Sequence, residues 1–218
     1  MTPPPLILAS SSPRRAELLR SAGYTFTVVV PPYIEPEHMG PGVPPIQQAE
    51  ALSYFKARSV ISQIGAGLIL AADTLVALRG AVYGKPMDLQ DARRILTALS
   101  GTTHEVITGI TLLDPATRRR LIRHDVTRVT MRPLRPEALE SYLNSGASEG
   151  KAGAYGIQDR DDPFVLRTEG SFSNVVGLPL ELLARMLKEW QADSGIPDSG
   201  VGGQGSTSAV QSRPGAPE

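Results

Sequence analysis

The order of the apolar patterns constrains this chain most, because strand-like runs alternate with segments of helical period. Apolar or β-branched runs predict strands at residues 6–9, 24–30 and 68–72, and a strand pair at 104–113 and 121–131. Helical spacing predicts helices over residues 14–21, 46–61, 89–99, 136–143 and 179–190. Strands and helices that interleave in this way predict an α/β fold with a mixed sheet.

The composition changes near the C-terminus. In residues 193–218, 14 of the 26 residues are Gly, Ser or Pro. Such a segment cannot bury enough apolar surface to offset the entropy that it would lose on ordering. We therefore expect one folded domain over residues 1–192 and a disordered tail over residues 193–218.

The overall balance of charge excludes several classes of protein. Lys and Arg number 22, as do Asp and Glu, so the chain lacks the excess positive charge used to bind nucleic-acid polymers. With no Cys it has no disulfide framework, thiolate nucleophile or cysteine zinc site. No apolar run approaches the roughly 18 residues of a membrane span. We therefore expect a cytoplasmic protein, with neither a nucleic-acid polymer nor a membrane as partner.

Two segments match catalytic or phosphate-binding motifs in part, but the rest of the chain lacks what those motifs require. Residues 146–150 (GASEG) match a nucleophile elbow, but that motif needs a strand before Ser148 and a histidine after it, and every His lies earlier. Residues 80–86 (GAVYGKP) have three residues between the glycines where a P-loop has four, and Pro86 replaces its Ser or Thr. Neither signature applies, although Lys85 on a glycine turn could still reach a phosphate.

Residues 6–15 (LILASSSPRR) predict a buried strand that runs directly into a helix. Ser12 can cap this helix, and Pro13 suits its first position. Arg14 and Arg15 then fall in the first turn, where cations oppose the helix dipole unless an anion joins them. The pattern predicts a phosphate site, the alternative being a solvent-exposed basic turn.

A second apolar run, residues 68–72, is followed at once by Asp73 and Thr74. Ligands of open α/β sheets bind beyond the carboxyl ends of the strands, so we expect Asp73 to project into such a crevice. There it could hold a divalent cation or accept a proton from an attacking water. The alternative is an Asp that only caps the segment after the strand.

Two further polar side chains, Lys56 and Gln158, are candidate site residues. Lys56 follows Phe55 on a predicted helix, where a lysine most often extends along the surface to solvent. Residues 151–158 (KAGAYGIQ) are rich in glycine, which suggests close approach of the backbone to another group, and Gln158 could hydrogen-bond the edge of a base.

The chain resembles the Maf family of nucleoside triphosphate pyrophosphatases over about residues 6–190. Six ordered motifs carry the resemblance: residues 8–15 (LASSSPRR), 72–74 (ADT), 84–86 (GKP), 99–109 (LSGTTHEVITG), 151–158 (KAGAYGIQ) and 174–180 (NVVGLPL). The resemblance implies a mixed, twisted sheet with flanking helices, two lobes around a deep cleft, and often a homodimer. It also implies a divalent metal, Mg or Mn, and hydrolysis of a nucleoside triphosphate to the monophosphate and pyrophosphate.

The resemblance assigns roles to individual residues. Asp73 matches the family's proton acceptor and is a candidate metal ligand. The polar and basic cleft residues of the family correspond to Ser12, Arg14, Arg15, Lys56 and Lys85. Arg14, Thr74 and Gln158 resemble the branch that acts on dTTP and UTP, with modified pyrimidine nucleotides as further candidates.

The chain departs from the family in two places. An acidic pair that is usually consecutive is Glu35 and Glu37 here, and we favour Glu35 as the second metal ligand. After Gln158 a run of charged residues, 159–162 (DRDD), replaces the usual Gly and predicts a longer loop.

Two other functions stay open at this point. One is a 7-methyl-GTP pyrophosphatase of the same family, although that branch tends to have Trp where this chain has Arg14. The other is a nucleotide-binding regulator of cell division without significant catalysis.

Overall fold

The computed structural model describes residues 4–32, 42–157 and 164–193. Glu35, Glu37 and Gln158 lie outside this part of the chain, as does the expected tail after Asp193. None of the helices in the described ranges combines the length and apolarity needed to cross a membrane.

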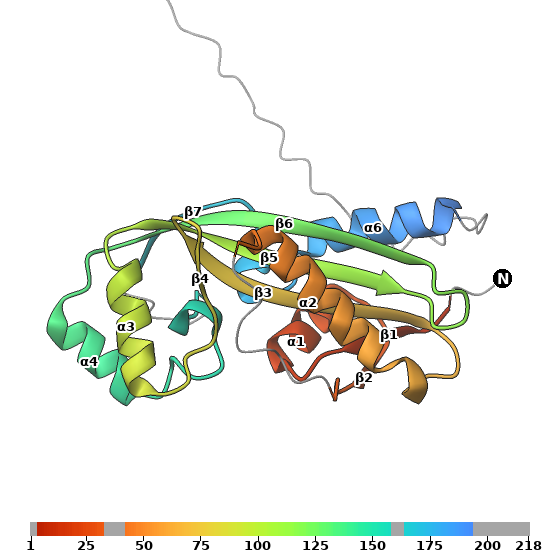
Figure 1. The fold of residues 1–218 in the computed structure, drawn as a ribbon, viewed down its shortest axis with the longest axis horizontal. Helices are drawn as coiled ribbons and strands as arrows, with labels where there is room; N and C mark the ends of the chain where they lie inside the picture. The colour runs from red at the N-terminus through yellow and green to blue at the C-terminus, as the bar shows by residue number, and fades with distance from the viewer. Residues whose placement is uncertain (1–3, 33–41, 158–163, 194–218) are drawn as a thin grey trace, which may run out of the picture.

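The described strands form one mixed sheet in the order β2-β1-β3-β5-β6-β7, with β4 paired to β3 (Figure 1). β2 and β3 both run parallel to β1, and all other pairs are antiparallel. The strands are β1 (Leu6–Ala9), β2 (Phe26–Val29), β3 (Leu68–Leu78), β4 (Ala81–Tyr83), β5 (Thr103–Leu113), β6 (Arg120–Met131) and β7 (Val165–Glu169). The helices are α1 (Pro13–Ser21), α2 (Pro45–Ser59), α3 (Leu89–Leu99), α4 (Pro136–Asn144), α5 (Phe172–Val176) and α6 (Leu180–Asp193), with 3-10 turns η1 (Ile61–Gln63) and η2 (Ala152–Ala154).

Three long strands, β3, β5 and β6, run through both halves of the molecule and join two lobes (Figure 1). In the first lobe, α1 and α6 pack on one face of the sheet around Leu19 and Leu183, and α2 covers the other face around Ala49 and Ala57. In the second lobe, α3, α4 and η2 enclose a separate core. The expected mixed α/β fold with two lobes is confirmed.

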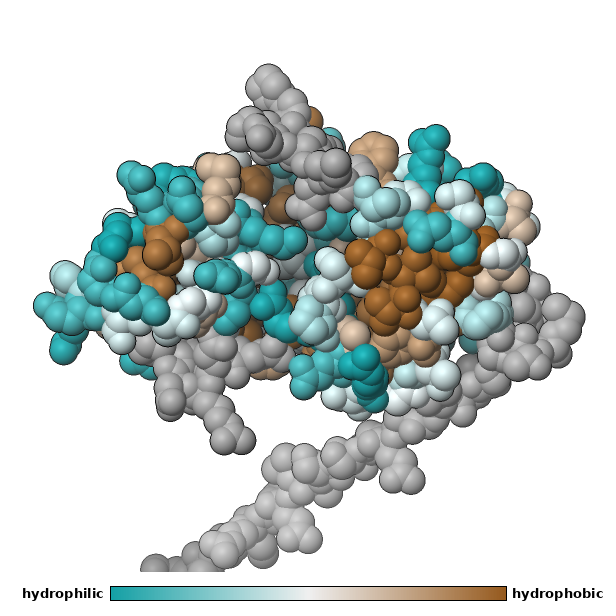
Figure 2. Space-filling model, turned by 90° about the horizontal axis from the view of Figure 1, so that it is seen from below, coloured by the Kyte–Doolittle hydropathy of each residue, from teal (hydrophilic) through white to brown (hydrophobic). Residues whose placement is uncertain are grey.

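On one face of the molecule, a hydrophilic region separates two apolar areas of the surface. Figure 2 views the molecule from below and shows hydrophilic side chains in the middle of this face, between an apolar area on either side. A charged ligand is less costly to bind among such hydrophilic side chains than on the apolar areas, because polar groups can hydrogen-bond to it.

Most predicted elements are confirmed, with small shifts at their ends. Asp88 caps α3 as expected, because its side chain accepts a hydrogen bond from the Asp91 N–H. The prediction that a strand ends before Asp73 is wrong, since β3 continues to Leu78. The pattern also missed β4, β7 and α5, which have three to five residues each and too few positions to display a period.

Candidate active site

A gap in the pairing of β3 creates the candidate site. β1 pairs with β3 only as far as Ala71, and β4 pairs with it only from Val76 onward. Along residues 72–75, therefore, no described strand covers this edge of β3. The gap opens into a cleft of about 490 Å³, within the usual range for a small-molecule site. The crevice thus lies at the carboxyl end of β1, with Asp73 on the long strand beside it.

The end of β1 supplies the first wall of the cleft. Pro13 occupies the first position of α1 and Ser12 the capping position, as expected. The Ser12 side chain makes no capping bond, however; instead the Ser10 hydroxyl accepts the Ser12 N–H at 3.1 Å. The first turn of α1, with its backbone N–H groups and no acidic residue, faces the cleft and suits an anion.

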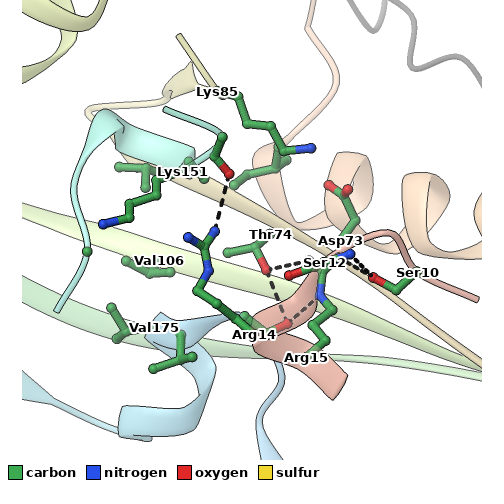
Figure 3. A pocket seen from close by; sticks show the side chains of 18 of the residues that line it. Ser10, Ser12, Arg14, Arg15, Asp73, Thr74, Lys85, Val106, Lys151 and Val175 are labelled. Carbon is green, nitrogen blue, oxygen red and sulfur yellow. Dashed lines mark hydrogen bonds between the residues drawn. The ribbon is translucent and has the colours of Figure 1, made fainter. Parts of the chain in front are cut away.

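Arg15 is held tightly by the protein itself (Figure 3). Its Nε donates to the Gly177 carbonyl at 2.8 Å and its Nη2 donates to the Thr74 hydroxyl at 3.1 Å. The Thr74 hydroxyl in turn lies 2.9 Å from that of Thr108, which is fully buried. These bonds fix α1 to β3 and to the end of α5, so Arg15 presents its charge at a set position on the cleft wall.

Unlike Arg15, the Arg14 side chain extends across the cleft toward its other wall (Figure 3). Its Nη2 donates to the Gly150 carbonyl at 3.2 Å, and this bond is exposed to solvent. An exposed bond to a neutral carbonyl is readily exchanged for a charge-assisted bond to a ligand. Arg14 is therefore the more adaptable of the two arginines.

Asp73 and Lys56 form a buried ion pair between β3 and α2. Asp73 is 4% exposed and Lys56 9%, so the expectation that Lys56 extends to solvent is wrong. Lys56 lies two helical turns after Ala49, on the same face of α2. Ala49 in turn packs directly over Gly109 of β5, which pairs with Asp73. The glycine lets α2 approach the sheet closely enough for Lys56 to reach the carboxylate.

The opposite wall comes from Lys85 and from residues 151–157, which we call the 151–157 loop. Lys85 extends into the cleft from the segment after β4 (Figure 3). The Gly153 N–H donates to the Gly84 carbonyl at 3.0 Å, so the loop is attached beside Lys85. Lys151 and Tyr155 of this loop also line the cleft.

The structure brings together every described residue predicted for the site. The residues concerned are Ser12, Arg14, Arg15, Lys56, Asp73, Thr74 and Lys85. Other residues that line the cleft were not among the predicted site residues: Ser10, Val106, Lys151, Tyr155 and Gly177. The glycine spacing of residues 151–156 is a signal that could have found Lys151 and Tyr155, and Val106 lies within the 99–109 motif.

The donors present fit a divalent cation that is shared with a ligand. Within the ranges that the structure describes, no group of three or more His, Cys, Asp and Glu side chains converges. Mg²⁺ rarely uses an all-protein cage; it is commonly held by one or two carboxylates together with substrate phosphates. Asp73, beside a cationic cleft, meets that description.

The chain is similar to several known proteins. A family model described as "Maf-like protein" matches residues 5–190. The chain is 44% identical over 184 residues to a dTTP/UTP pyrophosphatase of Ruminiclostridium cellulolyticum, covering 84% of this chain and 95% of that protein. It is also 44% identical over 185 residues to a dTTP/UTP pyrophosphatase of Carboxydothermus hydrogenoformans, covering 85% and 98%. A solved nucleoside-triphosphatase / dITP/XTP pyrophosphatase of Mycobacterium abscessus has a TM-score of 0.43 and 18% identity, covering 88% of this chain and 99% of that one.

Proposed function

The chain belongs to the Maf family, and from that premise we propose that it hydrolyses dTTP and UTP to the nucleoside monophosphate and pyrophosphate. The observation that carries the proposal is the buried Asp73 carboxylate, set among basic side chains in a cleft of nucleotide size. A site built only to bind a polyanion would gain nothing from a carboxylate there, because like charges repel. A carboxylate is useful where water must lose a proton.

Asp73 acts as the proton acceptor in this proposal. The oxygen of a water molecule attacks the α-phosphorus, and the anhydride bond between the α- and β-phosphates breaks. The water proton passes to the Asp73 carboxylate, and pyrophosphate leaves with the bridging oxygen. Lys56 holds Asp73 in place through their ion pair, so the acceptor is fixed before substrate arrives.

The basic residues bind the triphosphate. Arg14 and Lys85 reach in from opposite walls, and Arg15 and the first turn of α1 provide a fixed positive end. Ser12 adds a hydroxyl at this end. Several positive groups around one anion lower the cost of the charge that develops on the leaving pyrophosphate.

Asp73 would also hold a divalent cation, Mg²⁺ or Mn²⁺, with Glu35 as the second ligand. When bound, the cation would neutralise charge on the phosphates and polarise the bond that breaks. The Asp73 side chain would then serve both the metal and the water.

The choice of base rests on Arg14, Thr74 and Gln158. Arg14 stands where a 7-methyl-GTP pyrophosphatase of this family tends to have Trp, which favours a pyrimidine. Thr74 is held by Arg15 and Thr108 at the floor of the cleft. We further propose a cytoplasmic enzyme that forms a homodimer and also clears modified pyrimidine nucleotides.

A substrate panel tests this function. The purified full-length protein is incubated with Mg²⁺ and UTP, dTTP or 7-methyl-GTP, and pyrophosphate and phosphate are measured separately. We expect pyrophosphate from UTP and dTTP. Faster turnover of 7-methyl-GTP would move the chain to the other branch of the family. Tight binding of dTTP without turnover would instead support the regulator.

A further inference from the structure

The buried pair formed by His104 of β5 and Tyr155 of the 151–157 loop has no part in the chemistry described above. The His104 Nε2 and the Tyr155 hydroxyl oxygen share a hydrogen bond of 2.7 Å. Their rings also meet edge to face, with centroids 5.5 Å apart. His104 is 1% exposed and Tyr155 5%, so water does not compete for the bond.

The backbone of the loop shows that it needs to be held. Gly153 has φ +72°, and the next residue, Ala154, has φ +61° although it is not glycine. A residue with a Cβ rarely adopts this left-handed conformation, and it persists only where the surroundings impose it. Ala154 is fully buried and directly precedes Tyr155. The hydrogen bond to His104 thus acts next to the strained position.

Hydrogen bonds join the 151–157 loop, and Gly150 just before it, to neighbouring parts of the cleft. Arg14 of α1 donates to the Gly150 carbonyl, the Gly153 N–H donates to the Gly84 carbonyl, and Tyr155 bonds to His104. The first bond is exposed, and we expect substrate to compete for it. Among these bonds, the one to His104 joins two buried side chains.

The loop carries cleft-lining groups at both ends. Lys151 crosses Gly156 so closely that a Cβ there would lie 2.6 Å from the lysine Nζ. A shift of Tyr155 therefore moves Gly156, and with it the surface on which Lys151 rests. Small displacements of positioning groups have large effects on ligand affinity. The geometry of this wall therefore depends on His104, which does not itself line the cleft.

We propose that His104 is a positioning residue that, through Tyr155, holds the 151–157 loop in the conformation that binds the nucleotide. Its effect on nucleotide binding rests on the proposed function, whereas its effect on the loop does not. The neutral imidazole that burial enforces keeps the pair free of net charge in the second-lobe core.

Amide hydrogen exchange of the full-length protein tests the effect on the loop without any substrate. In Tyr155→Phe, which keeps the ring and removes only the hydroxyl, the Gly153 and Ala154 amides should exchange about tenfold faster, while the amides of β5 do not change. Unchanged protection of both amides would overturn the proposal. A general loss of protection in β5 as well would do the same, because it would show a role in the core as a whole.

Steady-state kinetics with UTP test the effect on binding. For Tyr155→Phe and His104→Leu we expect KM to rise about tenfold with kcat nearly unchanged, and His104→Gln, whose amide can still bond to the hydroxyl, to recover most of the affinity. The double variant should bind no worse than either single variant, since it leaves neither polar group buried alone. Additive losses, or a fall in kcat at constant KM, would contradict the proposal. If the wild type does not hydrolyse UTP but the loop amides respond as stated, the proposed function fails and the positioning role stands.

Discussion

Replacing Gly109 with Ala should break the site from a distance, because this glycine sets how closely α2 approaches the sheet. A Cβ at position 109 would lie 2.3 Å from the Ala49 carbonyl oxygen and 2.7 Å from the Glu50 nitrogen. Both atoms belong to the backbone of α2, so no side-chain rotation can relieve the contact. To reach an ordinary 3.4 Å contact, helix and strand must separate by about 1.1 Å.

That separation has two measurable consequences. Overpacking of a buried contact usually destabilises a protein by about 1–3 kcal/mol. Lys56 is carried on the same face of α2, so a shift of this size also pulls it from Asp73. Misplacement by about 1 Å in an active site can reduce turnover roughly a hundredfold.

Urea unfolding and pyrophosphate release from dTTP would measure the two effects in Gly109→Ala. Gly65→Ala is the matched control, because a Cβ there meets nothing within 4 Å and the backbone is unstrained. We expect the control to behave as wild type. If Gly109→Ala retained both the stability and the activity of wild type, α2 would not be held at this distance and our explanation of the Lys56–Asp73 pair would fail.

Three other predictions follow from the buried charges and the metal. Burial lowers the pKa of His104 from 6.5 to about 4, so the unfolded state binds a proton more readily than the folded state. The free energy of unfolding should therefore be unaffected by this group above pH 6.5 and should fall by up to about 3 kcal/mol as the pH drops toward 4. In urea titrations His104→Phe should flatten this pH dependence, and an unchanged slope would contradict the explanation. Lys56→Met removes the buried cation paired with Asp73 and should lower the free energy of unfolding, measured with denaturant, by about 3–5 kcal/mol. Adding Asp73→Asn should recover part of this loss, and no loss in Lys56→Met would show that the pair is not structurally coupled. Excess EDTA should stop pyrophosphate release and added Mg²⁺ or Mn²⁺ should restore it, whereas full activity in EDTA would exclude the proposed cation.

The long elements could be predicted because each displays its own period. α3, for example, begins after Asp88 and buries Ile95 and Leu96, as its spacing indicates. The end of β3 could not be predicted in the same way. A carboxylate after an apolar run normally marks a strand end, yet here Asp73 lies within a strand because the neighbouring β1 has already ended and Lys56 reaches it.

The site residues could be named from motifs, but their partners could not. Nothing near Lys56 in the sequence shows that it is buried, since that follows from the packing of α2 over Gly109. Arg15 was predicted to bind substrate, and the structure adds that its guanidinium is bonded to Gly177, more than 160 positions away. His104 lies within a recognised motif, but its link to Tyr155 depends on how the second lobe folds.

Pyrophosphate release from dTTP by Asp73→Asn, compared with wild type in the presence of Mg²⁺, tests the central claim most directly. Asn keeps the size of the side chain but cannot accept the proton, so turnover should fall at least about a hundredfold. The control Asp125→Asn changes a carboxylate on β6 that does not line the cleft, and should retain activity. A folded Asp73→Asn protein that released pyrophosphate at the wild-type rate would contradict the assignment of Asp73 as the proton acceptor.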